Sequence, residues 1–190
     1  MKKNDTLMNI WVEKLVFGWK GFARSEDWKV IFITGGAVPW SIVNLRIIKK
    51  KRDYYEAQIT EIVKKSVIET WNYEIIPGTP WINIDYNQQL KIKQWQIEEA
   101  LFHTKKYQAS LPFLPIIGME QTFWYRNKIE FSFWKYISHR EEIFQDFNVW
   151  FHKQGDFSRV LDFESCSLID EEQNKIYADI RAFTKESTLP

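Results

Sequence analysis

Basic side chains in the first third of the chain are the groups best suited to bind an anionic ligand. They are Lys20, Arg24, Lys49, Lys50, Lys51 and Arg52, of which the last four form an uninterrupted run. Arginine presents a planar fork of donors that fits phosphate oxygens, and lysine adds a compact positive charge. A patch of this kind binds nucleic acid through its phosphates, with a strong dependence on salt. The alternative is a solvated turn that binds nothing.

A second basic pair lies in the run Tyr125–Phe133, which reads YRNKIEFSF. Its alternation predicts a strand with one buried face and one exposed face. Arg126 and Lys128 would lie on the exposed face, where they either bind an anion or belong to an ordinary solvated surface. The buried face would carry Tyr125, Asn127, Ile129, Phe131 and Phe133, so the two phenylalanines are expected in the core.

Other reactive residue types form no recognisable site in the sequence. His103, His139 and His152 are isolated from one another and lack the spacing of a metal site. The paired acids Glu141-Glu142 and Glu171-Glu172 are adjacent, so their side chains point in different directions on a strand or helix. We therefore predict neither a metal site nor an acid–base pair.

Composition is typical of a globular protein. The chain has 190 residues, of which 45% are hydrophobic and 27% charged, enough for one ordinary domain or two small ones. No apolar run approaches the ~20 residues of a membrane helix, and the first residues lack the apolar stretch of a signal peptide. Cys166 is the only cysteine, which excludes an intrachain disulfide, and we expect a cytoplasmic protein.

Charge is distributed unevenly along the chain. Residues 1–68 contain 13 basic and 7 acidic residues, a net charge of +6. Residues 69–190 contain 13 basic and 18 acidic residues, a net charge of −5. An anionic partner is therefore expected at the first part of the chain.

Short strands separated by turns are predicted in the first 66 residues. Their even spacing and their content of Val, Ile and Tyr favour a small antiparallel barrel. The following segment, Val67–Tyr86, contains Pro77, Gly78 and Pro80 and is interpreted as a linker or an ordered loop. The predicted strands are Ile10–Val16, Lys29–Thr34, Ser41–Lys49 and Tyr54–Val63.

A mixed α+β region is predicted after this segment. It opens with a helix at Asn87–Tyr107, in which Leu90, Ile97 and Leu101 share one stripe. Strands follow at Phe123–Tyr136, Ile143–Lys153 and Phe157–Phe163, the last two joined by a hairpin turn at Gln154-Gly155-Asp156.

A final helix is predicted after Asp170, which is a good N-cap because Gln173 follows three residues later. The apolar side of this helix is expected to contain Ile169, Gln173, Ile176, Ile180 and Phe183, which keep a spacing of three and four residues.

Three segments, in this order, resemble the RNA (uracil-5-)-methyltransferase family, whose members methylate C5 of uridine in ribosomal and transfer RNA. VEKLVFGWKGFAR through KKKRDYYEAQITEIV resembles the TRAM domain, a five-stranded OB-like barrel. Asp85–Leu101 resembles the helix that opens the central domain of the family. YRNKIEFSF and Phe151–Leu168 resemble later parts of that domain. The resemblance implies a TRAM barrel at 1–66, a linker at 67–86 and a central α+β domain at 87–190.

The resemblance also implies which cofactors to expect. In the family a later Rossmann-like domain binds S-adenosylmethionine and supplies the cysteine nucleophile and the base. These 190 residues contain neither a glycine-rich cofactor turn nor an Asp-Pro-Pro-Arg-like motif, so we expect this chain alone to be inactive and to hold no cofactor.

Many members of the family also carry a four-iron cluster between the two domains. Three of its ligand positions fall on Thr70, Ile76 and Thr79, and Cys166 matches only the distant fourth. One thiolate cannot hold a cluster. We therefore expect no cluster and a Cys166 that is a small buried residue.

Tryptophan is unusually frequent, with ten residues against seven glycines. Asp27-Trp28 stands where a hairpin takes Asp-Gly, and Pro39-Trp40 stands where a type II turn needs a positive φ at its second position. A bulky residue rarely adopts that conformation. Our hypothesis is that the organism reads UGA as glycine at these codons; the alternative is drift toward aromatic residues. Six tryptophans occupy glycine positions of the family: Trp19, Trp28, Trp40, Trp124, Trp134 and Trp150.

The sequence thus predicts a mainly β protein with an OB-like barrel and an α+β domain. By resemblance it is the RNA-binding N-terminal half of a methyltransferase that uses S-adenosylmethionine and acts on uridine C5. Arg126, Lys128 and the six basic residues of the barrel would contact RNA. Ribosomal RNA is favoured over transfer RNA, because a TRAM barrel is more typical of the ribosomal branch. We expect a monomer without a membrane partner.

Two alternatives remain open at this point. One is a stand-alone, non-catalytic TRAM-type RNA-binding module, which the reading frame after codon 190 would distinguish from an enzyme. The other is a carbohydrate-binding barrel that uses its aromatic residues, which predicts RNA binding without salt dependence.

Overall fold

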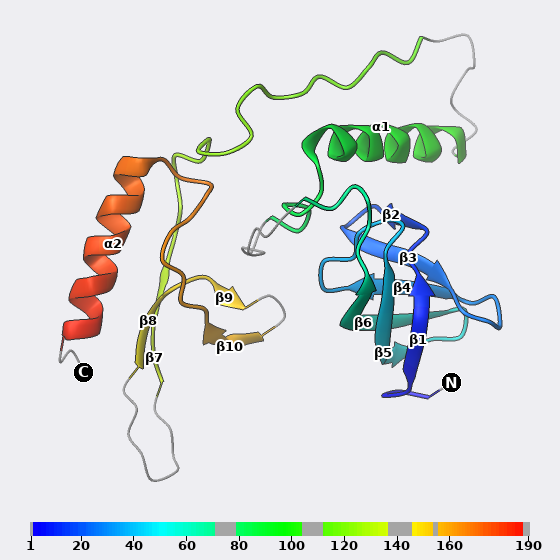
Figure 1. Cartoon of the computed structure of the whole chain (residues 1–190), viewed down its shortest axis with the longest axis horizontal. Coiled ribbons are helices and arrows are strands. Elements are labelled where there is room, and N and C mark those ends of the chain that lie inside the picture. Colours follow the sequence, from blue (N-terminus) through cyan, green and yellow to red (C-terminus); the bar gives the residue numbers. More distant parts are fainter. Residues whose placement is uncertain (1, 71–78, 104–111, 137–145, 154–155, 188–190) are drawn as a thin grey trace. The chain divides into compact units, whose positions relative to one another are not determined.

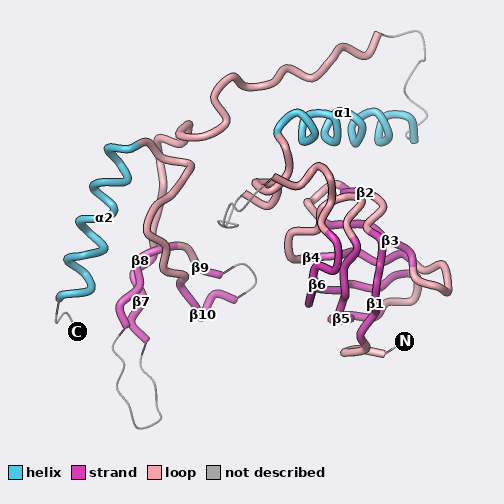
Figure 2. Tube along the Cα trace, in the orientation of Figure 1, coloured by secondary structure: helices cyan, strands magenta, loops and turns pink. Residues whose placement is uncertain are grey.

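The computed structural model describes residues 2–70, 79–103, 112–136, 146–153 and 156–187. These ranges contain ten strands and two helices (Figure 1). The chain forms two compact units, one of Met1–Ile75 with Thr79–Gly118 and the other of Ile76–Gly78 with Met119–Pro190. Strands and loops predominate over helix in the described ranges (Figure 2), so the predicted fold class, mainly β with α+β, is confirmed. Neither described helix is long and apolar enough to cross a membrane.

The first unit contains a six-stranded sheet in the order β1-β5-β6-β4-β3-β2. Strands β4 and β6 pair in parallel, and the other neighbours pair antiparallel. The strands are β1 (Thr6–Trp11), β2 (Lys14–Val16), β3 (Lys20–Arg24), β4 (Val30–Thr34), β5 (Ile42–Lys50) and β6 (Tyr54–Lys64).

Strands β1 and β2 are two halves of one extended segment that bends at Val12 and Glu13. Strand β1 pairs with β5 at one edge of the sheet, and β2 pairs with β3 at the other edge. At the bend, the Val12 N–H donates to the Ser41 carbonyl at 2.9 Å and the Glu13 N–H donates to the Phe22 carbonyl at 2.9 Å. The same segment therefore covers both edges, which gives a five-stranded, OB-like barrel.

The sequence predicted a small antiparallel barrel. The antiparallel part of that prediction is wrong for one pair of strands, because β4 and β6 pair in parallel, and some strand bounds differ as well. The predicted single strand Ile10–Val16 is broken at the bend, because Val12 turns its side chain into the core and its backbone bonds to the β4–β5 connection. Strand β3 was not predicted, since its five residues follow directly on the turn at Gly18 and Trp19. The other three predicted strands are confirmed within one residue at each end.

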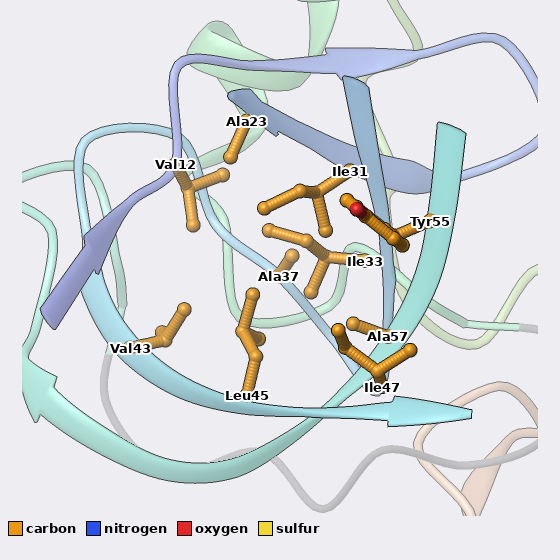
Figure 3. Close-up of a cluster of buried hydrophobic side chains, with 10 residues drawn as sticks. All are labelled: Val12, Ala23, Ile31, Ile33, Ala37, Val43, Leu45, Ile47, Tyr55 and Ala57. Atoms are coloured by element: carbon orange, nitrogen blue, oxygen red, sulfur yellow. The ribbon is translucent and has the colours of Figure 1, made fainter. Parts of the chain in front are cut away.

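Alternate residues of the strands fill the barrel core (Figure 3). Gly21 is required on β3, because a Cβ atom there would lie 2.5 Å from the Cβ of Ala37. Apart from Tyr55, the inward residues are small or aliphatic, and the residues between them face outward. The core consists of Val12, Ala23, Ile31, Ile33, Ala37, Val43, Leu45, Ile47, Tyr55 and Ala57.

Helix α1 (Tyr86–His103) confirms the predicted helix, and residues 104–107 of that prediction lie outside the described ranges. The predicted stripe is wrong as a packing face, because Ile97 and Leu101 are exposed and none of the helix residues is buried. Ile92 instead packs against a cluster at the end of the barrel. The cluster consists of Leu15, Val38, Ile68, Trp81 and Ile84, so the described parts of the predicted linker are ordered against the barrel.

The second unit pairs β7 with β8 and β9 with β10, both antiparallel. The predicted strand Ile143–Lys153 is interrupted at Phe151, and residues 143–145 and the turn residues 154–155 lie outside the described ranges. The elements are β7 (Ser132–Tyr136), β8 (Asp146–Trp150), β9 (His152–Lys153), β10 (Asp156–Val160) and α2 (Glu171–Glu186).

Helix α2 begins as predicted, but its buried face differs. Asp170 caps it, with the Gln173 N–H donating to Asp170 Oδ1 at 2.7 Å in a complete capping box. The predicted apolar side is wrong for Ile176, Ile180 and Phe183, which are exposed, whereas Ile169 is buried as expected. The buried residues within the helix are Tyr177 and Thr184. Tyr177 is buried in place of the isoleucines, because its ring packs in the core and its hydroxyl donates to carbonyl oxygens there.

The predicted strand Phe123–Tyr136 is wrong before Ser132. Trp124 has φ 56°, which interrupts an extended strand, and the Trp124 and Arg126 N–H groups donate to the carbonyls of Ser167 and Leu168 at 3.0 and 2.9 Å. The expected buried face is only half correct. Ile129 and Phe131 pack against the core of the unit, whereas Tyr125, Asn127 and Phe133 are exposed.

Four tryptophans have positive φ angles: Trp19 (65°), Trp28 (61°), Trp40 (68°) and Trp124 (56°). The prediction that the Asp27-Trp28 and Pro39-Trp40 turns need this conformation is confirmed. Trp134 and Trp150 do not have positive φ, since they lie in β7 and β8. The backbone thus distinguishes four of the six proposed glycine positions from the other two.

Candidate nucleic-acid interface

The four consecutive basic residues span the last two positions of β5 and the start of the turn that leads to β6. Lys49 and Lys50 end β5, and the Lys51 N–H donates to the Tyr54 carbonyl at 2.9 Å to close the turn. All four side chains are exposed, and among the described residues none of them has an ion-pair partner. Residues 49–52, called the basic turn below, therefore present positive charge that no ion pair among the described residues neutralises.

Arg24 lies at the same end of the sheet as the basic turn. The sheet register aligns Arg24 with Val30 on β4, and Val30 with Tyr54 on β6. The Arg24 guanidinium is 4.0 Å from a Glu13 carboxylate oxygen and lies over the Phe22 ring, 5.6 Å from its centroid. Its charge is partly balanced, and the guanidinium also lies over the Trp28 ring, 5.8 Å from its centroid.

Lys20 is separated from this group. It begins β3, opposite Val16 of β2, whereas Arg24 ends the same strand. Four residues of strand correspond to about 13 Å. The structure therefore places five of the six predicted barrel cations at one end and Lys20 at the other.

Three aromatic side chains line the outer face between these two ends, and sequence analysis did not single them out. Phe22 of β3, Phe32 of β4 and Tyr54 of β6 are half-buried and are called the aromatic strip below. The ring centroids of Phe22 and Phe32 are 6.5 Å apart, and those of Phe32 and Tyr54 are 5.3 Å apart, both edge to face. The sequence signal that could have identified this face is the alternation of Lys20, Phe22 and Arg24 with the small residues Gly21 and Ala23, which are buried.

Lys14 marks the other end of the strip and is neutralised there. Its Nζ bonds to Glu99 Oε1 of α1 at 2.7 Å and lies 5.4 Å from the Phe22 centroid and 4.6 Å from the Trp95 centroid. The Gln96 side chain also donates to the Leu15 carbonyl at 2.9 Å. These contacts fix α1 beside the barrel and leave the basic turn as the main positive group.

Acidic groups near Arg24 limit the positive charge at that position. Asp27 lies in the β3–β4 turn, where the Ser25 hydroxyl donates to its carboxylate. This hydrogen bond, with smaller contributions from Tyr55 and Lys29, lowers the pKa of Asp27, which therefore stays ionised at neutral pH. Glu56 is the cross-strand partner of Lys49. Net positive charge is thus concentrated at the tip of the basic turn.

Arg126 and Lys128 belong to the second unit and have local partners. The Arg126 Nε donates to the Lys128 carbonyl at 3.1 Å, and Lys128 Nζ lies 2.9 Å from Glu130 Oε1. All three side chains are exposed. Such an exposed pair stabilises little, and it reduces the positive charge offered to a ligand.

Cys166 is buried in the core of the second unit. Burial raises the pKa of its thiol, partly opposed by backbone hydrogen bonds from Leu168 and Ile169 and by the charge of Arg126. Of the family's cluster positions, Thr70 and Thr79 are described and Ile76 is not. In the described ranges, no three His, Cys, Asp or Glu side chains come together as a metal site.

Comparison with known proteins shows similarity to RNA methyltransferases. A protein of Bacteroides thetaiotaomicron named "Uncharacterized RNA methyltransferase" is 34% identical over 179 residues, covering 88% of this chain and 38% of its own length. One of the same name from Porphyromonas gingivalis is 32% identical, covering 79% of this chain and 34% of its own. The "23S rRNA (uracil(1939)-C(5))-methyltransferase RlmD" of Cupriavidus pinatubonensis is 28% identical, covering 74% and 29%.

The chain therefore spans little more than a third of the length of the first of these relatives. No protein-family model matches the chain. The similarity to the relatives extends over both units, since it covers up to 88% of this chain in these three comparisons.

Proposed function

The chain belongs to the RNA methyltransferase family of these relatives, and we propose that it is the RNA-binding N-terminal portion of an enzyme that methylates uridine C5 in 23S ribosomal RNA. In this proposal S-adenosylmethionine is the methyl donor. Residues 1–66 act as the TRAM barrel, residues 67–86 connect it, and residues 87–190 act as the central domain. In this proposal the protein is cytoplasmic and its partner is RNA.

The observation that carries the proposal is the basic turn on an OB-like barrel. Residues 49–52 are exposed and, among the described residues, unpaired. OB-like barrels bind single-stranded nucleic acid through a sheet face and the adjoining loops, one of which corresponds to this turn. The carbohydrate-binding alternative does not account for a concentration of positive charge at this position.

The proposed role of this portion is to hold RNA while a base reaches the chemistry. A uridine in structured RNA must leave its stack before C5 is accessible, at a cost of a few kcal/mol. Contacts from the basic turn to phosphates on either side of the base would offset that cost without reading sequence. This chain would therefore contribute affinity and position rather than bond making.

The salt dependence of RNA binding tests the proposal. We expect this chain to bind a 23S rRNA fragment with an affinity that falls as salt rises, and to bind it more tightly than transfer RNA. Each phosphate contact of a single strand contributes about 0.7 to the log–log slope. Replacing Lys50, Lys51 and Arg52 together by Gln should therefore reduce the slope by about 2.

A matched variant controls for net charge. Replacing Lys64, Lys65 and Lys91 by Gln removes the same charge at exposed positions outside the basic turn, and its slope should match that of the unmodified chain. Equal slopes for both triple variants would contradict an RNA-binding role of the basic turn.

A further inference from the structure

The aromatic strip has the features of a stacking surface for unpaired bases. Phe22, Phe32 and Tyr54 are outward-facing residues of three neighbouring strands, and each is half-buried. Their ring planes are nearly perpendicular, 73° and 74° between neighbours. Phe22 and Phe32 are direct cross-strand partners. The row therefore offers ring faces and edges in different orientations rather than one closed stack.

The strip leads to the basic turn, which indicates what binds there. Tyr54 is the first residue after the turn and accepts the Lys51 N–H through its carbonyl. Arg24 lies over Phe22 on the same side. A single strand of nucleic acid has phosphates for the cations and base faces for the rings, and alternating aromatic and basic groups are typical of its binding sites. A duplex hides its base faces and would reach only the turn.

We propose that the aromatic strip stacks two or three unpaired bases of an RNA single strand whose phosphates lie along the basic turn and Arg24. This inference rests on the proposed function and deepens it, because it identifies an unpaired segment as the ligand. The strip itself contains no tryptophan, whereas Arg24 of the proposed site also lies over the Trp28 ring, 5.8 Å from its centroid.

Binding of short RNAs to the whole chain tests this proposal. Replacing Phe22, Phe32 or Tyr54 singly by Leu keeps an apolar side chain and removes the ring. We expect affinity for a single-stranded RNA to fall about tenfold for each, with an unchanged salt slope. Phe102→Leu, an exposed ring on α1, is the control and should change nothing.

A second measurement leaves the protein unaltered, in case a variant folds poorly. An RNA in which consecutive bases are removed but phosphates retained should bind about as weakly as the ring variants bind intact RNA, and a duplex should bind weakly as well. Equal binding of intact and base-free RNA would overturn the stacking proposal while leaving the proposed function intact. Loss of salt dependence would instead count against the proposed function itself.

A different observation concerns the tryptophans in turns. Trp19, Trp28, Trp40 and Trp124 have positive φ and are 61, 78, 48 and 63% exposed. An L-residue with a Cβ atom is strained in this region of backbone space, and a bulky one is an outlier there. Their exposure means that little burial of the ring compensates for the strain. A protein would not be expected to repeat this arrangement four times.

Each barrel position has the geometry of a turn that calls for glycine. Pro39 and Trp40 are the central residues of a turn closed by the Ser41 N–H to the Val38 carbonyl at 3.3 Å, which has the type II pattern. Gly18 and Trp19 both have positive φ and end the three-residue loop between the paired residues Val16 and Lys20, where a left-handed glycine is common. Trp28 follows a turn that starts at Ser25, the usual place of a left-handed glycine.

Other tryptophans in the described ranges do not have positive φ. Trp81 is buried in the cluster under α1, Trp95 lies in α1, and Trp11 lies in β1, all without positive φ. From this contrast we infer that the organism's own protein has glycine at positions 19, 28, 40 and 124, because a codon written here as tryptophan is decoded as glycine.

Peptide mass spectrometry of the protein from its native cells tests the inference directly. We expect glycine at the four positions and tryptophan at positions 81 and 95, with UGA and UGG respectively in the gene. Tryptophan at the four positions would overturn it.

A thermal melt of recombinant variants tests the strain by itself. Replacing the four tryptophans together by Gly should raise the melting midpoint by at least about 4 °C, whereas Trp95→Gly within the helix should lower it. A lower midpoint for the fourfold variant would also overturn the inference.

Discussion

The barrel and the second unit place their aromatic and charged side chains in opposite ways. In the barrel core, Tyr55 is the only aromatic residue among those described. The aromatic strip lies outside, and the cations of the basic turn have no ion-pair partner in the described ranges. In the second unit, by contrast, Phe131, Trp150 and Tyr177 contact one another inside the core.

The basic side chains at the end of α2, unlike those of the basic turn, are paired with a carboxylate. Asp162 accepts from Arg181 Nε at 2.7 Å and Nη2 at 2.8 Å, and from Lys185 Nζ at 2.6 Å. These cations are used to hold the helix to the chain before it. The difference indicates that aromatic and basic residues of the second unit mainly stabilise it, whereas those on the outer face of the barrel are available to a ligand. Substitutions should separate these two roles.

Tyr177→Ala should have the largest effect on stability. The ring lies 4.8 Å from the centroids of both Phe131 and Trp150, and the hydroxyl bonds to the Val149 and Phe163 carbonyls at 2.9 and 2.8 Å. Losing a buried aromatic side chain costs roughly 3–5 kcal/mol. Chemical denaturation should show this loss, whereas Phe183→Ala, at an exposed position of the same helix, should cost less than about 0.5 kcal/mol.

Asn174→Ala should have the next largest effect. The side chain accepts the Cys166 N–H at 2.8 Å and donates to the carbonyls of Cys166, Ile169 and Asp170 at 2.9–3.1 Å. Alanine is the better helix former, so we expect a net cost of about 1–2 kcal/mol. The neighbouring Lys175→Ala is the control. Equal stability of the two variants would show that this network does not fix the turn before α2.

Asp162→Asn should change how stability depends on pH. Hydrogen bonding to Arg181, with a smaller contribution from Lys185, lowers the pKa of Asp162 against the opposing effect of burial. A carboxylate with a lowered folded-state pKa contributes stability above its unfolded pKa of about 3.9 and loses it as pH falls through the folded value.

Partial exposure reduces the expected size of this effect to about 1 kcal/mol or less at neutral pH. In acid, the stability of the unmodified chain should fall more steeply than that of Asp162→Asn, and the two should converge once the pH lies below the lowered folded-state pKa of Asp162. Asp179→Asn, on the exposed side of α2, should follow the unmodified chain. Parallel curves for Asp162→Asn and the unmodified chain would contradict a pKa lowered by these partners.

Features that depend on neighbouring residues in the sequence were predicted better than features that depend on tertiary packing. The N-cap at Asp170, the positive φ angles at Trp28 and Trp40, and three barrel strands depend on neighbouring residues and were predicted correctly. The buried face of α2 was not predicted, because spacing favours Ile176 and Ile180, whereas the hydrogen bonds that the Tyr177 hydroxyl donates to distant carbonyls favour burial of Tyr177. Which face is buried depends on partners that periodicity does not contain.

The candidate site shows the same limit. The basic turn could be predicted from the sequence as a run of basic residues. The aromatic strip could not, because its rings come together only when β3, β4 and β6 are aligned in register. The ion pair between Lys128 and Glu130 could not be predicted either, because an alternating strand places both residues on one face without showing that they pair. Sequence identified the charges, and the sheet determines which of them act together.

Arg126 and Lys128 should have the smallest effect on RNA binding of the predicted basic residues. Lys128 is paired with Glu130, and the Arg126 guanidinium is held by the Lys128 carbonyl. Each loss of an unpaired phosphate contact would change the salt slope by about 0.7. Because both groups are engaged locally, the double variant Arg126→Gln, Lys128→Gln should change the slope by less than about 0.7, compared with about 2 for the basic turn. A change as large as that of the basic turn would mean that the second unit binds RNA as strongly as the barrel, and the contrast between the two units would then be limited to their cores.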